Sequence, residues 1–576
     1  MTPRITLERP ALDVLPEPAL TTRRVRVRAR RRMARVARVK RLNDWPLSLL
    51  ALAVPTVIGA LRIVSSFDRP FTSGGDVSFI ELAVRQALHG GIALGPYSRF
   101  GWHHPGPAVF YLLAPVYWLG GERSRSLFLG SWLINASALL ATVWIVRAQA
   151  GEAVARITAA IAGIYLGVVG FAELINPWNP SLLAAPVLLL LVACAAAGTG
   201  STWSLVVAAV TGSYLVQTHI GTLPLTAVLL AVGLVGWLAH VRSARRARAS
   251  GAGAGAAPGR AIAIPLLVGL ALLSVMWVGP VVQQVRGDPG NLSRVVDFYR
   301  HPPASATPKH HSLRASVAAV SDRVTTVSSG DALDLRWRSA RVDVAAILAT
   351  MGLVVGVVGW HRSRFLAWTG ILGTVAMLVG VFAASRVIGE LFRYLVLWAD
   401  ALGLPAVIGA TGLAWIVVGA RLRRRLPEGS RWGAAAAVAG AAATIALTVL
   451  VTRSVVHAPT ESYVDSPDAR SVAAHIERLV GHDHARPFQV RVVAAQFADG
   501  PVLLDLAKDG YRFRLTREID LYRGTSSSRG GPVFELRPAD PHAPTSTRNP
   551  FEVTYGTLNL RVLPPLASRA PGPDQP

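Results

Sequence analysis

The chain has little cysteine: Cys194 is the only one among 576 residues, and it lies inside an apolar run. One cysteine cannot form a disulfide within the chain or supply a cysteine-rich metal site. The adjacent His103 and His104 have no carboxylate at a suitable short spacing, so we predict no metal ligands there. The sequence otherwise leaves the cofactor open, including a divalent metal.

Charge is also scarce, because only 16% of the residues are charged while 52% are hydrophobic and the mean hydropathy is +0.41. A soluble protein carries about 25% charged residues. Apolar runs of about 20 residues are long enough to cross a bilayer. We therefore predict an all-α polytopic membrane protein with about eleven spans, at 46–64, 127–146, 153–172, 181–197, 203–218, 222–239, 262–282, 343–360, 365–384, 401–419 and 432–452.

Acidic residues are the scarcer sign: 33 Asp and Glu face 59 Lys and Arg, for a net charge of +26. Such an excess can indicate a nucleic-acid partner. Here the basic runs, including 21–41, 240–250 and 420–426, each adjoin an apolar run, as cytoplasmic anchors of membrane proteins do. We therefore exclude nucleic acid, and we expect residues 1–45 to form a disordered cytoplasmic tail near anionic membrane lipids.

The apolar segment 107–119 is the one whose crossing decides the topology. If it spanned, the basic loops 240–261 and 420–431 would fall outside, against the positive-inside rule. We predict that it does not cross; a short tilted span with one miscounted helix elsewhere is the alternative. The protein would then lie in the plasma membrane with its N-terminus on the cytoplasmic side. The loops 65–126 and 283–342 and the whole segment 453–576 are exoplasmic, and 46–452 is the transmembrane domain.

The first exoplasmic loop contains an amphipathic pattern at 71–91, with Asp76 at the mouth of the predicted helix. A partly desolvated carboxylate at a membrane surface can act as a general base. It can equally cap the helix, and the residues alone favour the cap. Glu81 completes a Ser78-x-x-Glu81 capping box and can pair with Arg85, so we do not expect it to be catalytic.

Other polar and aromatic residues gather on the predicted exoplasmic side. Aromatic rings suit sugars and arginines suit phosphate, although interfacial aromatics often form only a membrane belt. A histidine at a helix end is more often structural, and Arg393 has either Glu390 or a lipid phosphate as its anionic partner. The candidate binding residues are Tyr97, Arg99, His103, His104, Glu173, Asn179, His219, Arg300 and Arg393.

The last part of the chain has the pattern of a small α/β domain. We predict a helix at 466–480 and strands at 488–497, 511–516 and 551–563. The Ser/Arg/Pro-rich segment 524–548 is expected to be mobile. The domain would bind the acceptor or shield the site.

Together these features resemble the GT-C class of membrane glycosyltransferases, and among them the family of protein O-mannosyltransferases and the lipid A aminoarabinose transferase. In that family the first-loop helix begins with an essential Asp, a Pro-Pro turn follows about thirty residues later, and the next helix does not span. Asp76 and the "HHPGP" turn match this layout. The resemblance covers roughly 46–300. The family's second carboxylate is missing at position 77, and its Pro-Pro is Pro-Gly-Pro here.

The resemblance implies an inverting glycosyltransferase with Asp76 as general base. Its donor would be a polyprenyl-phosphate-linked sugar, and its acceptor a cell-envelope glycan, lipid or protein. Arg393, Arg99 and Arg300 would meet the leaving phosphate. Composition rich in Ala, Val and Arg suggests an actinobacterial origin. The alternative is a flippase or transporter of lipid-linked glycans, but such proteins carry charges near span centres and internal repeats, neither of which is found here.

Overall fold

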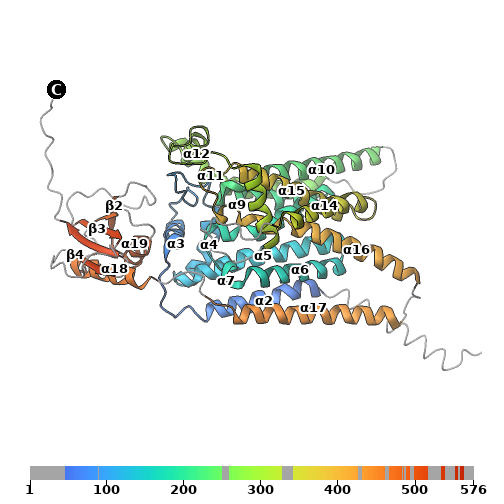
Figure 1. The fold of residues 1–576 in the computed structure, drawn as a ribbon, viewed down its shortest axis with the longest axis horizontal. Helices are drawn as coiled ribbons and strands as arrows, with labels where there is room; N and C mark the ends of the chain where they lie inside the picture. Colours follow the sequence, from blue (N-terminus) through green and yellow to red (C-terminus); the bar gives the residue numbers. More distant parts are fainter. Residues whose placement is uncertain are drawn as a thin grey trace, which may run out of the picture.

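The computed structural model describes a helical bundle with a small sheet domain at one end (Figure 1). The described residues are 46–88, 90–249, 259–326, 341–425, 431–460, 466–482, 484, 488–492, 499–516, 533–538, 552–555 and 558–563. The predicted basic tail 1–45 lies outside these residues.

Long helices form the bundle and run roughly along one direction (Figure 1). They are α2 (Leu47–Val64), α5 (Ser124–Ala150), α6 (Glu152–Val169), α8 (Ala184–Gly198), α9 (Thr202–Thr218), α10 (Leu223–Ala249), α11 (Gly259–Arg286), α14 (Val342–Gly359), α15 (Arg364–Ser385), α16 (Leu404–Arg425) and α17 (Arg431–His457). Ten helical segments of the described chain are long and apolar enough to cross a membrane. The chain is therefore a multi-pass membrane protein.

The eleventh predicted span, 203–218, corresponds to α9, which is the difference between eleven predicted spans and the ten found. With 17 residues, α9 falls just below the 18-residue length that the other ten reach. It packs along α8, α10 and α11. Seventeen residues still lie at the lower end of the ~17–25 that cross a bilayer.

Helix α8 lies at the centre of the bundle because its sequence is almost entirely small and aliphatic. All of its residues, Ala184 to Gly198, are buried, and α5, α9, α10 and α15 surround it. Small side chains let neighbouring helices approach closely, which is the usual way that helices associate in membranes. Cys194 belongs to this core and is 1% exposed.

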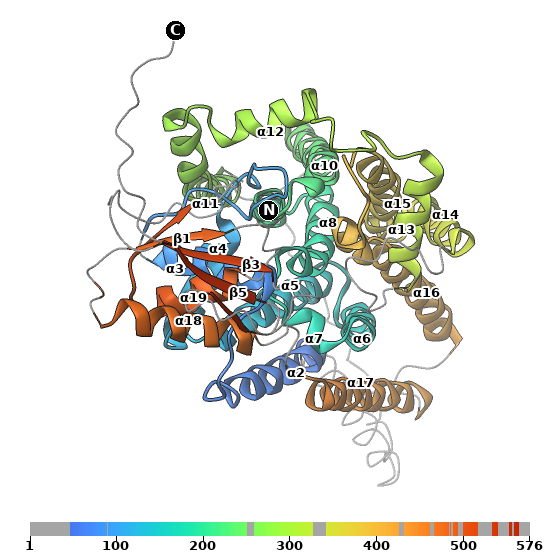
Figure 2. The same cartoon turned by 60° about the vertical axis from the view of Figure 1, so that its left-hand side comes forward.

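Short helices collect at the end of the bundle that carries the sheet, which we call the domain-bearing end (Figures 1 and 2). They include α3 (Gly75–Leu88), α4 (Ala108–Leu119), α7 (Phe171–Leu174) and α12 (Asn291–Arg300). The remaining short helices are η1 (Asn179–Leu182), η2 (Ile220–Thr222), α13 (Leu313–Thr326) and η3 (Arg393–Ala401). The basic ends of α10 and α16 lie at the opposite end (Figure 1).

Helix α4 is the segment whose crossing was in question. It has 12 residues, about 18 Å of helix, which is short of the ~30 Å hydrocarbon core. It packs against α3 and α5, so it shares the domain-bearing end with α3, in agreement with the prediction that it does not cross.

The C-terminal domain is a five-stranded mixed sheet with two helices. Its strand order is β2-β1-β3-β5-β4, with β1 parallel to β2 and β3, and β5 antiparallel to β3 and β4. The elements are α18 (Pro467–Val480), β1 (Phe488–Val492), α19 (Asp499–Lys508), β2 (Phe513–Thr516), β3 (Val533–Pro538), β4 (Glu552–Tyr555) and β5 (Leu558–Leu563).

The expectation of a mobile segment at 524–548 was wrong for Val533–Pro538, which is strand β3. Phe534 and Leu536 are buried, and the alternation of apolar residues places them on one face of the sheet. The surrounding Ser, Arg and Pro residues make this short alternating pattern hard to recognise in the sequence. Helix α19 was not predicted; it packs on α3 and joins the domain to the bundle.

Candidate functional site

The candidate site begins at Asp76, in the first turn of α3. Gly75 starts this helix with φ of 54°, a conformation that glycine adopts without strain. The Asp76 carboxylate accepts a hydrogen bond from the Tyr97 hydroxyl, and the side chain of Trp178 also reaches it. Burial raises the pKa of Asp76, and the bonds from Tyr97 and Trp178 lower it in part. A carboxylate with raised proton affinity is suited to general-base chemistry.

Aromatic rings from two further segments extend the site away from Asp76. The Trp178 ring lies 5.1 Å from the Tyr394 ring, which stacks on Phe392 at 5.7 Å. The guanidinium of the exposed Arg99 lies over the rings of Phe392 and Phe100, at 4.9 and 4.8 Å from their centres. The structure thus brings three of the predicted features together, namely Asp76, Tyr97 and Arg99, beside one row of aromatic faces.

The predicted histidines support the loop that carries Tyr97 and Arg99. The Asn291 side chain of α12 accepts a hydrogen bond from the His103 backbone N–H and donates one to the His103 carbonyl oxygen, at 2.8 Å each. The His103 Nδ1 lies 3.0 Å from the Gly95 carbonyl oxygen. The His104 ring lies 4.7 Å from the His219 ring, and its Nδ1 accepts from the Ile220 backbone N–H at 3.2 Å.

Both of these inner rings are buried, and their protonation follows from that. Burial, reinforced by the other two histidines, lowers the pKa of His104 well below its ordinary value, and burial lowers the pKa of His219 to about 4. Both imidazoles are therefore neutral at pH 7, so neither supplies a positive charge to a phosphate.

Glu173 and Asn179 form hydrogen bonds with nearby protein groups. Glu173 accepts from the Ser181 hydroxyl at 2.6 Å, and burial raises its pKa. The Asn179 side-chain amide donates to the Thr218 carbonyl oxygen at 3.1 Å. These contacts fix the turn between α6 and α8, which carries Trp178 against Asp76.

Arg393 is 1% exposed and forms an ion pair with Asp322 of α13 at 3.2 Å. Its neighbour in the cluster is the pair Arg323–Asp400, with 2.6 Å between the Arg323 Nε and an Asp400 oxygen. The sequence offered Glu390 or a lipid phosphate as the partner of Arg393. It gave no signal for Asp322, because that residue lies on a different element about 70 positions earlier.

Arg300 is exposed at the end of α12. The same helix places Phe298 against Phe100, 4.6 Å between ring centres, and against Trp102 at 5.6 Å. The end of α12 that carries Arg300 is thus packed on the loop that carries Arg99.

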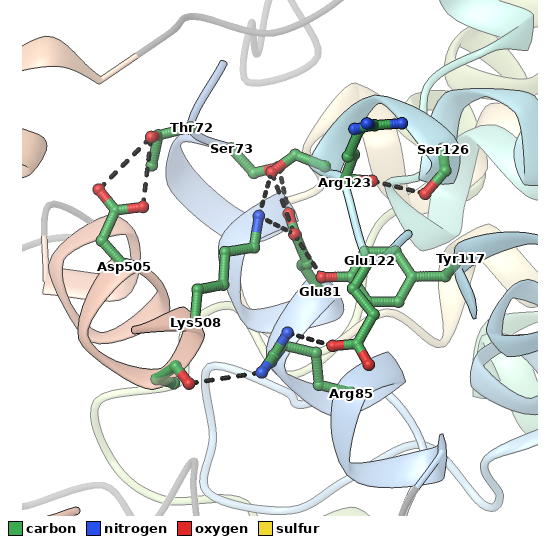
Figure 3. A network of polar contacts seen from close by, with 12 residues as sticks. Thr72, Ser73, Glu81, Arg85, Tyr117, Glu122, Arg123, Ser126, Asp505 and Lys508 are labelled. Atoms are coloured by element: carbon green, nitrogen blue, oxygen red, sulfur yellow. Dashed lines mark hydrogen bonds and ion pairs between the residues drawn. The ribbon is translucent and has the colours of Figure 1, made fainter. Parts of the chain in front are cut away.

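Glu81 differs from its prediction. No capping box forms: the Ser78 hydroxyl donates to the Gly75 carbonyl oxygen, and Arg85 pairs with Glu122. Glu81 is fully buried and is surrounded by donors (Figure 3). They are Ser73 at 2.7 Å, Tyr117 at 2.8 Å, Ser124 at 3.0 Å and Lys508 at 2.5 Å.

Among the described residues, no group of three or more His, Cys, Asp or Glu side chains is placed to hold a metal ion. The arrangement around Asp76 provides a carboxylate, aromatic faces and exposed arginines, which is the equipment for binding a sugar and an anionic group and for removing a proton.

Comparison with known proteins identifies the fold. No family model matches the chain, and no curated protein matches it. Among solved structures, the crystal structure of ArnT from Cupriavidus metallidurans bound to undecaprenyl phosphate is similar, with a TM-score of 0.51 and 13% sequence identity. The match covers 89% of this chain and 97% of ArnT. The fold is therefore the GT-C fold that the resemblance predicted, extended over nearly the whole chain.

Proposed function

We propose that this protein is a membrane glycosyltransferase that moves a sugar from a polyprenyl-phosphate donor to an acceptor hydroxyl at the domain-bearing end. The observation that carries the proposal is the half-buried carboxylate of Asp76, held by Tyr97 and Trp178 at the start of α3. The GT-C fold is consistent with it, because the similar ArnT structure contains undecaprenyl phosphate.

In the proposed reaction Asp76 takes the proton of the acceptor hydroxyl as that oxygen attacks the anomeric carbon. The bond from that carbon to the phosphate oxygen breaks, and the configuration inverts. Tyr97 holds the Asp76 carboxylate, and the rings of Trp178 and Tyr394 offer flat faces to a sugar. A general base of this kind typically contributes about 10²- to 10⁴-fold to the rate.

The leaving phosphate gains charge and needs cations that are free to approach it. We assign this role to Arg99 and Arg300, both of which are exposed near the aromatic row. Arg393 belongs to a buried ion-pair cluster instead. We assign it an indirect role: it begins η3, the element that carries Tyr394.

The orientation that we propose follows from charge. The basic ends of α10 and α16 face the cytoplasm together with the N-terminus, so the domain-bearing end is exoplasmic. Nucleotide sugars do not occur on that side, which favours a lipid-linked donor. The acceptor would be a glycan, lipid or protein of the cell envelope.

The function is tested with purified full-length protein in lipid nanodiscs. A panel of undecaprenyl-phosphate-linked pentoses and hexoses is incubated with cell-envelope extract as acceptor, and the undecaprenyl phosphate released is measured by mass spectrometry. We expect enzyme-dependent release for at least one donor. Wild-type protein that releases it from no donor, and that does not bind undecaprenyl phosphate, would contradict the proposal.

Arg99→Gln tests the phosphate contact, and Arg386→Gln is its matched control. Both side chains are exposed, and each guanidinium lies over a phenylalanine ring, at 4.8 Å for Arg99 and 5.0 Å for Arg386. A charge-assisted hydrogen bond contributes about 1.5–3 kcal/mol. Arg99→Gln should therefore weaken undecaprenyl phosphate binding by about 10- to 100-fold, and Arg386→Gln should leave it unchanged. Equal effects would remove Arg99 from the site.

A further inference from the structure

A second concentration of charge lies at the far end of α3 from Asp76, around a cavity of 560 Å³. The loop that follows α2 and the turn between α4 and α5 form its walls. Helices α3 and α19 add one side chain each, Arg85 and Lys508 (Figure 3). We call this cavity the cationic pocket. Its five basic residues are Arg69, Arg85, Arg123, Arg125 and Lys508.

The pocket keeps an excess of positive charge after its carboxylates are counted. Asp68 and Glu122 line it, and Glu81 lies behind Lys508 at 2.5 Å. Five cations therefore face three carboxylates. The Asp68 side chain is almost fully exposed, and it lies 3.6 Å from the guanidinium of Arg123, which is half exposed. Solvent therefore weakens the attraction between Asp68 and Arg123.

The inner cations are held in place by contacts behind the cavity. Arg85 pairs with Glu122 and reaches the Ala507 carbonyl oxygen. The buried Arg125 donates from Nε to the Arg69 carbonyl oxygen at 3.2 Å and lies over the Phe71 ring at 4.9 Å. Cations that are fixed in this way lose little conformational freedom when an anion arrives. Arg69 and Arg123 remain exposed at the rim.

The level of the pocket points to the class of ligand. Val64 ends the span α2 and Ser124 begins the span α5, and the pocket is built from residues next to these two ends. This is the depth at which phospholipid headgroups lie. In the proposed orientation it is also the outer side of the membrane, where cations near span ends are ordinarily few. Their concentration here needs a reason other than topology.

The pocket is separate from the site around Asp76. Arg85 follows Asp76 by nine residues on the same helix, and a rise of about 1.5 Å per residue places the two some 13 Å apart along α3. Glu81 lies between them on the same helix, with its donors around it. A ligand in the pocket would therefore be a second ligand and not the group that reacts at Asp76.

We propose that the cationic pocket binds a phosphate group, supplied by the headgroup of an anionic membrane lipid. Guanidinium groups match phosphate oxygens with pairs of parallel hydrogen bonds, which favours phosphate among the anions found at this depth. A bound headgroup would join the loop after α2, the α4–α5 turn and α19, and so would fasten the C-terminal domain to the membrane surface.

Binding is measured by native mass spectrometry on the purified full-length protein. Dioctanoyl phosphatidylglycerol is the probe, neutral dioctanoylglycerol tests for the acyl chains alone, and inorganic phosphate is added as a competitor. The test variant is Arg69→Gln with Arg123→Gln, because these rim residues can change without disturbing the buried pairs. The matched control is Arg286→Gln with Arg294→Gln, two exposed arginines at the same end of the bundle.

Each cation near an anionic surface contributes roughly 1 kcal/mol, so the test variant should bind phosphatidylglycerol about ten- to thirtyfold more weakly. The control pair should bind like wild type, and both variants should unfold at the wild-type temperature. Competition by inorganic phosphate supports a phosphate from either source; its failure to compete, with the variant effect retained, supports a lipid headgroup. Equal binding by both variants, or equal binding of dioctanoylglycerol, would overturn the proposal. This readout does not depend on sugar transfer.

Discussion

Asp76 and Glu81 lie five residues apart on one short helix, and their surroundings are opposite. Asp76 is partly exposed and accepts from Tyr97, with the Trp178 side chain also in reach. Glu81 is 0% exposed and is bound by two serines, a tyrosine and a lysine. One carboxylate is saturated by donors from other elements, and the other keeps room for a further partner.

The difference agrees with a structural role for Glu81 and with the proposed reactive role of Asp76. Donors that saturate a carboxylate stabilise its charge and leave no lone pair for a substrate proton. A carboxylate that is partly desolvated and has few donors holds a proton more tightly, so it can take one from an acceptor hydroxyl. The domain contact through Lys508 therefore involves Glu81, whereas the general base that we propose is Asp76.

The largest effect is expected when each of these two carboxylates is exchanged for its amide, which tests the difference between Asp76 and Glu81 most directly. Asp76→Asn should lower sugar transfer by about 10²- to 10⁴-fold with normal stability, because an amide cannot take the proton. Glu81→Gln should do the reverse: it should retain the transfer rate and lose about 1–3 kcal/mol of stability, since Lys508 loses its carboxylate.

Stability is conveniently read from Cys194, which is 1% exposed and is the only thiol. A thiol-reactive dye reports the temperature at which the core opens. If Asp76→Asn transferred sugar at the wild-type rate, the general-base assignment would fail at once. A rate loss in folded Glu81→Gln as large as that of Asp76→Asn would show that the two acids are not separable.

The second prediction concerns the buried ion pairs. Arg393→Gln leaves Asp322 without its 3.2 Å partner and should destabilise the protein by about 3–5 kcal/mol. Arg341→Gln breaks the exposed pair with Asp343, which solvent screens, and should leave the stability nearly unchanged. The Cys194 dye measures both. An Arg393→Gln protein as stable as wild type, with weakened undecaprenyl phosphate binding, would return Arg393 to the donor site.

The helices of the bundle could be predicted from the sequence because each membrane span depends only on its own run of residues. A run of about 20 apolar residues is long enough to cross the membrane whatever its neighbours are, and the parity of basic loops predicts a side for 107–119 without any contact being known. The helix at 466–480 and the strand at 511–516 are equally local, since apolar periodicity defines them. Strand β3 was not predicted, because six residues within a polar segment show too short an apolar alternation to be recognised.

The site could be predicted only where its residues are neighbours in sequence. The place of Asp76 at a helix mouth could be predicted, although only the family resemblance favoured a general base over a helix cap there. The partners of Glu81 come from positions 73, 117, 124 and 508. Without them a short-range capping box was the natural interpretation. The pairing of Arg393 with Asp322 has the same cause, because no pattern in either segment indicates the other.

A smaller effect is expected from the donor to Asp76. The hydroxyl of Tyr97 lowers the pKa of Asp76 against the larger rise caused by burial. Tyr97→Phe should raise that pKa further, so the acidic limb of the pH–rate profile should move to higher pH while the plateau rate changes less. Tyr111→Phe, which loses a 2.9 Å bond to the Ile92 carbonyl oxygen, is the control and should not move the limb. A limb that stays in place would separate Tyr97 from Asp76.

The smallest expected effect extends the comparison to a third carboxylate near α3, Asp505 of α19. Burial raises the pKa of Asp505 to about 6, although Lys508 and the hydroxyl of Thr72, 3.3 Å away, lower it. The folded protein thus binds this proton more tightly than the unfolded chain does. Its contribution to stability is complete below pH 4 and is lost as the pH rises through about 6.

Hydrogen exchange of the α19 amides, corrected for intrinsic rates, should therefore show less protection at pH 7.5 than at pH 5, by less than about 2 kcal/mol. Asp505→Asn should remove the part of this change between pH 4 and 6. A remainder centred near pH 7 should persist, because the pKa of Glu477 on α18 is raised to about 7 by burial and by Asp509. Asp297→Asn, an exposed acid of α12, should leave the whole profile as in wild type. If Asp505→Asn does too, the junction between α19 and α3 does not respond to this carboxylate, and the other contacts between the two helices, including the Glu81–Lys508 pair, hold them together.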